Sequence, residues 1–267
     1  MAKIEEVREG SVKKAKRQQP AAIKYYLVAY NFANALGWGY ILVSTLIHIF
    51  ALDQGSVSVT GWVDRPAGYP AWALYFEKNF LPNEWFHTFR RCGTTGEKLG
   101  RATTIVQTFA ILEVLHSLLG WVRSPFGTVL MQVASRYYAI YGVNYLFPHT
   151  LQNPIYTTMV LSWSFTEVIR YIFYALNLLG TEPYPLLWLR YTTFWLLYPT
   201  GASSEAFLIF ATLPSLHEKP LAYWGLHEWF RLAMFGIWWP SLYVLYTYMI
   251  KQRRKVLGGA GKKTKAQ

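Results

Sequence analysis

Two side chains in the C-terminal half of the chain have the types and the spacing needed for acid–base chemistry. Tyr198 and Glu205 lie seven residues apart inside an apolar run over residues 186–213. Seven residues are two turns of an α-helix, so both side chains share one face, about 10.5 Å apart along the axis. The run is long enough to cross a bilayer, where a carboxylate costs about 2.5 kcal/mol or more. The pair therefore predicts a proton donor and a base that line one cavity.

Two residues between them, Pro199 and Gly201, are typical of a shaped segment of a membrane helix. Proline removes one backbone N–H and leaves the carbonyl of Trp195 without its helical donor. Glycine lets a neighbouring helix approach closely, and such features are tolerated where the backbone meets protein or lines a cavity. We expect a shaped pocket here; the alternative is an ordinary proline kink.

Five further ionisable residues lie within apolar runs or near their ends, and with Glu205 they make three acids and three bases. They are Glu113, Arg136, Glu167, Arg170 and Arg190. Unpaired charge in hydrocarbon is costly, so this balance predicts internal neutralisation, with Glu167 and Arg170 paired along one helix face. We expect these residues and Gly201 to bind substrate or support the structure; the alternative for the charges is latches between helices. Glu205 differs because its own helix carries no cation within a turn or two.

His116 could suggest two other chemistries, and neither is expected. A metal site would need more His or Cys residues nearby, and Cys92 is the only cysteine, which also excludes an intrachain disulfide. The segment from His116 to Arg123 has the spacing of a tyrosine-phosphatase loop, but Ser117 stands where the nucleophilic cysteine is needed. We therefore expect a satisfied interior histidine and no bound metal.

The composition is that of a protein that crosses a membrane several times. Hydrophobic residues make up 53% of the chain, aromatic residues 18% and charged residues 15%, against about 25% charged residues in soluble domains. The net charge of +12 comes from basic residues concentrated at the two ends, so it does not indicate nucleic-acid binding. Flanking positive charge stays on the cytosolic side, which predicts cytosolic termini and an even number of spans. No cleaved signal peptide is expected before residue 25.

The apolar runs predict an all-α, polytopic membrane protein with six transmembrane helices. The predicted spans cover residues 25–52, 102–122, 126–147, 155–179, 186–213 and 229–250. Residues 25–250 are predicted to form a six-span membrane catalytic domain between cytosolic basic tails at 1–24 and 251–267. Residues 53–101, which are polar and rich in Gly, Pro and aromatic residues, are predicted to form a long lumenal loop, and interfacial helix is the expected form for part of it.

Several short motifs, in order, make the chain resemble a known enzyme family. They are Leu112-Glu113-Val114-Leu115-His116, Gln132-Val133-Ala134-Ser135-Arg136, Trp163-Ser164-Phe165-Thr166-Glu167-Val168-Ile169-Arg170-Tyr171, Leu189-Arg190-Tyr191 and Leu197-Tyr198-Pro199-Thr200-Gly201-Ala202-Ser203-Ser204-Glu205. Over about residues 25–255 the chain resembles the very-long-chain (3R)-3-hydroxyacyl-CoA dehydratases of the endoplasmic reticulum, once called phosphatase-like. The resemblance implies that Tyr198 and Glu205, of the pattern Y-P-x-G-x-x-x-E, are the catalytic pair. Family members often carry Cys where Ser117 stands and Pro where Arg123 stands, and neither departure touches that pair.

The resemblance also implies an endoplasmic-reticulum membrane location, six spans and work in the fatty-acid elongation cycle, beside the other enzymes of that cycle and in contact with membrane lipid. Dehydration of a very-long-chain 3-hydroxyacyl-CoA removes a proton at C2 and expels hydroxide from C3, so it needs one base and one acid. Glu205 suits the base and Tyr198 the donor, although the sequence leaves open which does which. Nothing is oxidised, so no cofactor is expected. The alternatives are a non-catalytic membrane scaffold and a transporter that uses the buried charges.

Overall fold

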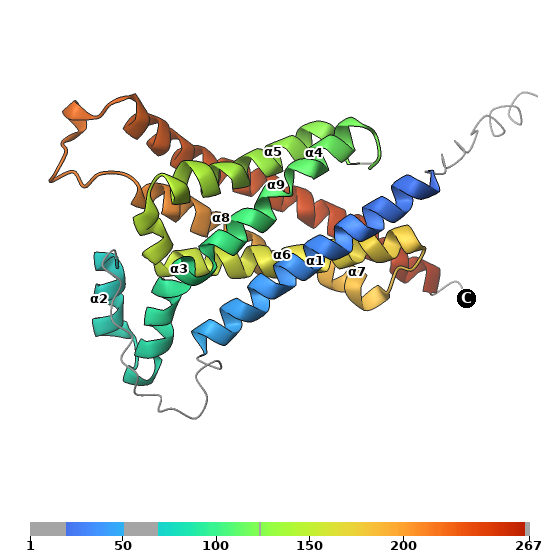
Figure 1. Cartoon of the computed structure of the whole chain (residues 1–267), viewed down its shortest axis with the longest axis horizontal. Helices are drawn as coiled ribbons and strands as arrows, with labels where there is room; N and C mark the ends of the chain where they lie inside the picture. Colours follow the sequence, from blue (N-terminus) through green and yellow to red (C-terminus); the bar gives the residue numbers. More distant parts are fainter. Residues whose placement is uncertain (1–19, 51–68, 123, 265–267) are drawn as a thin grey trace, which may run out of the picture.

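The protein is a bundle of helices, shown in Figure 1 as a computed structural model that describes residues 20–50, 69–122 and 124–264. Its α-helices are α1 (Ala21–Ile49), α2 (Ala71–Phe80), α3 (Phe86–Thr108), α4 (Ile111–Leu118), α5 (Phe126–Tyr137), α6 (Pro154–Leu179), α7 (Tyr184–Arg190), α8 (Phe194–Ala211) and α9 (Leu226–Thr264). Shorter 3-10 turns are η1 (Asn83–Trp85), η3 (Pro148–Gln152) and η4 (Leu221–Tyr223), and η2 (Tyr138–Tyr145) is a π-helix. The described residues contain no strand, which confirms the all-α prediction for this part of the chain.

Some predictions fall on residues that the structure does not describe. They concern most of the N-terminal tail, residues 53–68 of the predicted loop, Arg123 and residues 265–267.

Six long helical segments run back and forth along the described bundle: α1, α3 with α4, α5 with η2, α6, α7 with α8, and α9. The junctions are short, because Phe109 and Ala110 separate α3 from α4 and residues 191–193 separate α7 from α8. Helix α1, with a mean hydropathy of 1.4 over its most apolar stretch, is the one described helix that is long and apolar enough to cross a membrane by length and composition. The segments match the predicted spans in number, and six spans stays a prediction.

The segment predicted as a lumenal loop, residues 53–101, is helical over most of its described part, and its lumenal location stays a prediction. Helix α2 and the first four turns of α3 lie within it, because tertiary contacts bury polar side chains that hydropathy assigns to water. Arg90 of α3 is 7% exposed and forms an ion pair with Glu77 of α2, which is 1% exposed. Arg91 donates a 3.0 Å hydrogen bond to the carbonyl of His48 at the end of α1. Helix α9 continues to Thr264, so it includes most of the predicted basic tail at 251–267, whose cytosolic location stays a prediction.

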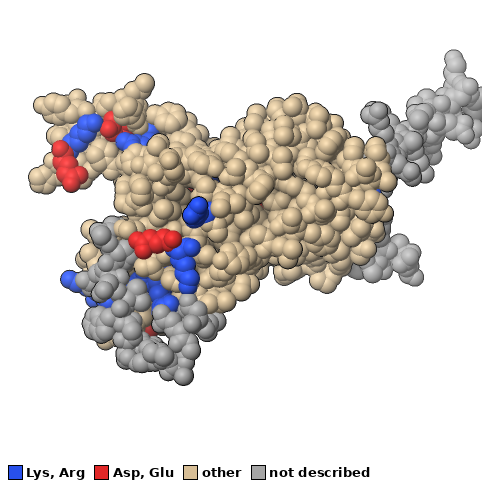
Figure 2. Space-filling view, in the orientation of Figure 1, with Lys and Arg blue, Asp and Glu red and all other residues tan. Residues whose placement is uncertain are grey.

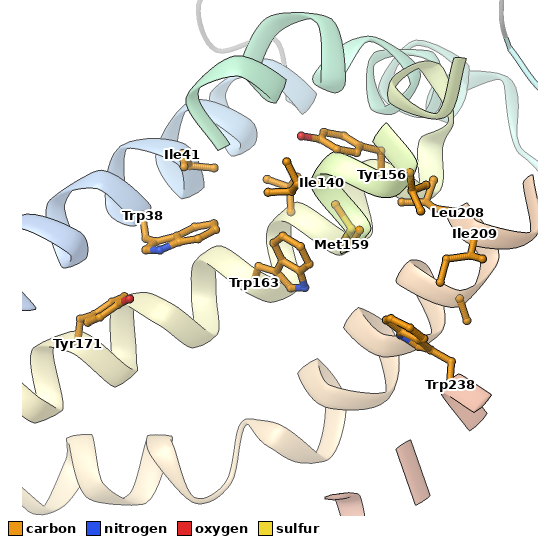
Figure 3. Packing of buried hydrophobic residues seen from close by; sticks show 14 of the residues in the cluster. Trp38, Ile41, Ile140, Tyr156, Met159, Trp163, Tyr171, Leu208, Ile209 and Trp238 are labelled. Carbon is orange, nitrogen blue, oxygen red and sulfur yellow. The ribbon is translucent and has the colours of Figure 1, made fainter. Parts of the chain in front are cut away.

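Helix α6 is the centre of the bundle and contacts α1, α3 and α8. Its buried Tyr156, Met159 and Trp163 form one core with apolar side chains from the neighbouring helices. Figure 3 shows Trp38 and Ile41 of α1 on one side of them and Leu208 and Ile209 of α8 on the other. The most buried helix therefore carries side chains toward several partners at once, which suits it to position a site.

Small and hydroxylated residues bring α6 and α8 close together. A Cβ added to Gly201 of α8 would lie 3.2 Å from the Cβ of Ser162 on α6. Hydroxyl pairs flank this approach, with 2.9 Å between Ser162 Oγ and Thr200 Oγ1 and 2.6 Å between Thr158 Oγ1 and Ser204 Oγ. Small residues and interhelical hydroxyl bonds are the usual means of close helix packing in membranes. This approach fixes the helix that carries Glu205 against α6.

A second close approach, between α3 and η3, leads to a prediction about stability. A Cβ on Gly96 of α3 would lie 2.2 Å from the backbone oxygen of Leu151, whereas a Cβ on Gly39 of α1 would meet nothing within 4 Å. We expect Gly96→Ala to destabilise the protein by about 1–3 kcal/mol through overpacking. The control Gly39→Ala should instead be neutral or stabilise by up to about 1 kcal/mol, because alanine is the better helix former. Thermal unfolding in detergent compares them; equal midpoints would contradict the contact between α3 and η3.

Candidate active site

The Glu205 carboxylate lies at the centre of the bundle, held by two tryptophans from different helices. Glu205 is 9% exposed. Its Oε1 accepts a hydrogen bond of 2.7 Å from Trp163 Nε1 of α6, and its Oε2 accepts one of 3.1 Å from Trp238 Nε1 of α9. Figure 3 shows the Trp163 indole nitrogen directed from α6 toward α8. Each carboxylate oxygen therefore has one neutral donor, and three helices meet at this group.

Tyr198 lies seven residues before Glu205 on the same helix. Helix α8 runs unbroken through Pro199, and the interruption of this segment lies at residues 191–193. The two side chains thus share a face at a separation of about 10.5 Å along the axis. Tyr198 is half-buried, and its hydroxyl makes no hydrogen bond with any other described residue. Because no described residue binds this phenol, its hydroxyl is available to a ligand on the helix face that also carries the buried carboxylate.

Four of the other expected site residues form one cluster of alternating charge, drawn from α4, α5 and α6. Arg170 donates to both oxygens of Glu113, at 2.9 and 2.6 Å, and through Nε to Glu167 at 2.7 Å. Arg136 pairs with the other oxygen of Glu167, which is 2% exposed. Tyr171 also donates its hydroxyl to Glu113. The predicted local pairing of Glu167 with Arg170 is confirmed, and two acids neutralise two bases.

We expected three acids to neutralise three bases inside the bundle, and this is wrong for Glu205 and Arg190. Neither Glu205 nor Arg190 forms an ion pair with any described residue. The Arg190 guanidinium instead lies 4.5 Å from the ring centre of Tyr174 and 4.7 Å from that of Phe173, and donates to the Tyr174 hydroxyl at 2.9 Å. Aromatic faces attract a guanidinium, so Arg190 has neutral partners.

An aromatic ring connects the charge cluster to Glu205. The Arg136 guanidinium lies 5.1 Å from the centre of the Trp163 ring, and the Trp163 N–H points to Glu205. Sequence reasoning did not assign a role to Trp163 or Trp238. Trp163 lies four residues before Glu167, so helical spacing could have placed it on the charged face; no such signal exists for Trp238, whose contact crosses between helices.

His116 has the environment expected of an interior histidine. It is 3% exposed, its Nε2 lies 3.0 Å from the Tyr26 hydroxyl, and its ring stacks on Trp121. Within the described ranges, no three His, Cys, Asp or Glu side chains lie close enough together to hold a metal ion.

A helical bundle with a buried carboxylate and a free phenol on one helix face defines a candidate acid–base enzyme. Residues 107–259 match the family described as protein tyrosine phosphatase-like protein, PTPLA, and this stretch contains every residue of the site described above. The chain belongs to this family, as the motifs predicted.

The relatives to which the chain is similar are named as very-long-chain (3R)-3-hydroxyacyl-CoA dehydratases. The chain is 35% identical over 253 residues to the Caenorhabditis elegans very-long-chain (3R)-3-hydroxyacyl-CoA dehydratase hpo-8, covering 91% of this chain and 99% of that protein. It is 33% identical over 250 residues to the rice very-long-chain (3R)-3-hydroxyacyl-CoA dehydratase PASTICCINO 2A, covering 90% and 96%. A probable very-long-chain (3R)-3-hydroxyacyl-CoA dehydratase of Schizosaccharomyces pombe is 45% identical over 152 residues, covering 57% and 71%. No solved structure matches the chain.

Proposed function

We propose that this protein dehydrates very-long-chain (3R)-3-hydroxyacyl-CoA to trans-2-enoyl-CoA, the third step of the fatty-acid elongation cycle, with Glu205 and Tyr198 as its catalytic pair. One observation carries the assignment of the pair. Glu205 is buried and has no ion-pair partner among the described residues, and the Tyr198 hydroxyl, two turns earlier on the same helix, has no hydrogen-bond partner among them. The relatives named as dehydratases of this substrate class support the reaction.

The chemistry requires one proton to leave C2 and one to reach the departing oxygen at C3. In this mechanism Glu205 takes the C2 proton, the C2–C3 double bond forms, and the C3–O bond breaks as Tyr198 gives its proton to the leaving hydroxide. Water departs, and transfer of the proton from Glu205 back to the tyrosinate restores both groups. The two groups lie about two helical turns apart, so the reacting carbons sit between them.

We further propose that the bundle spans the endoplasmic-reticulum membrane six times with cytosolic termini, and that residues 25–250 form the membrane catalytic domain. In Figure 1 the beginning of α1 and the end of α9 lie at the same end of the bundle. Figure 2 shows charged side chains gathered at the opposite end, near α2 and the segment before α9, while the body of this face is almost free of them.

This orientation also suggests how the substrate enters. Helix α8 begins beside α7, at the end of the bundle that holds the termini, and runs away from it (Figure 1). Tyr198 is therefore nearer that end than Glu205. The nucleotide of the acyl-CoA would remain at the basic cytosolic face, the thioester would reach the pair, and the acyl chain would run deeper between helices.

The reaction is tested directly with the purified full chain in detergent. A long-chain (3R)-3-hydroxyacyl-CoA is added, and mass spectrometry follows the loss of one water. We expect conversion to the trans-2-enoyl-CoA without any added cofactor. A membrane scaffold or a transporter would leave the substrate unchanged, and that result with folded protein would overturn the proposed function.

The orientation makes a separate prediction. We expect protease to remove tags placed at residues 1 and 267 from the outside of sealed microsomes, because the basic ends hold both termini in the cytosol. A tag inserted at residues 216–218, in the segment before α9, should be protected until the membrane is opened. Cleavage of one terminal tag and protection of the other would contradict an even number of spans.

A further inference from the structure

The two tryptophans at Glu205 are chemically unusual partners for a buried carboxylate. Indole nitrogen only donates, so each ring presents one fixed N–H and cannot accept a proton from the acid. The two donors come from α6 and α9 and bind different oxygens, at 2.7 and 3.1 Å. Trp163 is 3% exposed and Trp238 is 9% exposed, which leaves the rings little room to turn. Together they fix the position and the rotation of the carboxylate plane.

Glu167 provides a comparison within the same bundle. It is also buried, at 2% exposed against 9% for Glu205, but it pairs with Arg136 and Arg170. Two cations compensate its charge and occupy its oxygens, which suits a structural role. Neutral donors hold a carboxylate without cancelling its charge, so Glu205 stays able to take up a proton. The surroundings of the two glutamates therefore suit Glu167 to a structural role and Glu205 to a catalytic one. In other enzymes, too, the environments of two acids give them different roles.

Trp163 also lies against the charge cluster. The Arg136 guanidinium sits 5.1 Å from the centre of its ring, and Arg136 is itself held by Glu167. A cation over an indole face attracts the π-electrons and polarises the N–H bond, which strengthens donation to the acceptor beyond it. The order Glu167, Arg136, Trp163, Glu205 is therefore a path along which the cluster can influence the carboxylate without touching it.

We propose that Trp163 and Trp238 are positioning residues that hold Glu205 in its reactive orientation. This inference rests on the proposed function, because it concerns the rate of the same dehydration. Neither tryptophan is proposed to touch the reacting atoms.

The sharpest test removes the N–H and keeps the bicyclic ring. Replacing Trp163 with 3-benzothienylalanine exchanges the indole N–H for sulfur at nearly constant shape, and Trp163→Phe is a second variant that uses an ordinary residue. We expect kcat to fall about 10- to 100-fold, the usual consequence of losing a hydrogen bond to a charged group, while KM changes less than about threefold. The same replacement at Trp238 should act in the same direction.

Trp38 is the matched control. It is 1% exposed, belongs to the same core and lies with its ring centre 6.4 Å from that of Trp163, but it makes no hydrogen bond to a carboxylate among the described residues. Its replacement with 3-benzothienylalanine should leave kcat unchanged. An equal loss of kcat at Trp38 and Trp163 would mean that the core as a whole matters, and would overturn the inference.

A second readout separates positioning from stability. If Trp163 acts through Glu205, its replacement in a Glu205→Gln background should lower the residual rate by less than about twofold, because the group being positioned has already lost its function. If the double variant instead loses kcat by the product of the two single losses, the inference is overturned. The proposed function fails separately: wild-type protein that does not dehydrate the substrate, or a fully active Glu205→Gln variant, contradicts it. A different set of results would contradict only the positioning role. In that case the wild type is active and Glu205→Gln is inactive, but the protein without the Trp163 N–H keeps its full kcat.

Discussion

Glu205→Gln is expected to lower the turnover of a long-chain (3R)-3-hydroxyacyl-CoA by about 10²- to 10⁴-fold, the usual contribution of a general base. The amide keeps the size of the side chain and its carbonyl oxygen still accepts from one of the two tryptophans, but its NH2 group then faces the other indole N–H, and it cannot take the C2 proton. The unpaired indole N–H should lower stability by about 1–3 kcal/mol, and thermal unfolding must show that the variant is still folded at the assay temperature. Initial rates of enoyl-CoA formation in detergent, measured at saturating substrate, give the loss in kcat.

Tyr198→Phe tests the other half of the pair. It removes a hydroxyl that has no hydrogen-bond partner among the described residues, so the fold should be unaffected while turnover again falls about 10²- to 10⁴-fold. The two groups act on one substrate, so the double variant should lose much less than the product of the single losses.

Matched controls for this pair lie far from the site. Glu218→Gln alters an exposed glutamate in the segment before α9, and Tyr243→Phe alters a tyrosine that is 71% exposed. Both should retain wild-type turnover. If well-folded Glu205→Gln protein keeps near-normal dehydration, Glu205 is a structural charge and the proposed mechanism must be abandoned.

Arg170→Ala is expected to cost about 3 kcal/mol of stability, because it removes one partner from a partly buried ion-pair network and leaves the buried Glu167 with one cation fewer. It deletes the hydrogen bonds to both oxygens of Glu113 and the bond to Glu167. Two acids then lose a cation in a bundle that is proposed to lie in hydrocarbon. Thermal unfolding in detergent should therefore show a much larger drop for Arg170→Ala than for Tyr198→Phe.

A surface arginine and a paired variant give the comparison that this prediction needs. Arg101→Ala alters an exposed side chain on α3 and should change stability by less than about 0.5 kcal/mol. Combining Arg170→Met with Glu113→Gln should cost less than the sum of the two single changes, because the residues share one interaction. Normal stability of Arg170→Ala with selective loss of activity would instead place Arg170 in the catalytic machinery.

Features that depend on short stretches of chain could be predicted from the sequence. Composition and the apolar runs predicted an all-helical protein, and the motifs predicted its family. The spacing of Tyr198 and Glu205, and the pairing of Glu167 with Arg170, follow from helical geometry alone, because residues seven or three apart on a helix have fixed relative positions. These local relations hold whatever the helix packs against.

Features that depend on contacts between helices could be decided only by the tertiary structure. Glu113 and Arg170 are 57 residues apart in sequence, and Glu205 is separated by 42 residues from Trp163 and by 33 from Trp238. The packing of α4, α6, α8 and α9 selects these partners from many aromatic and charged side chains. Packing also decided that residues 86–101 begin the long helix α3, where polar composition predicted no span. Partners such as Glu77 for Arg90 make burial of that polar helix favourable, and hydropathy along the chain contains no information about partners on another helix.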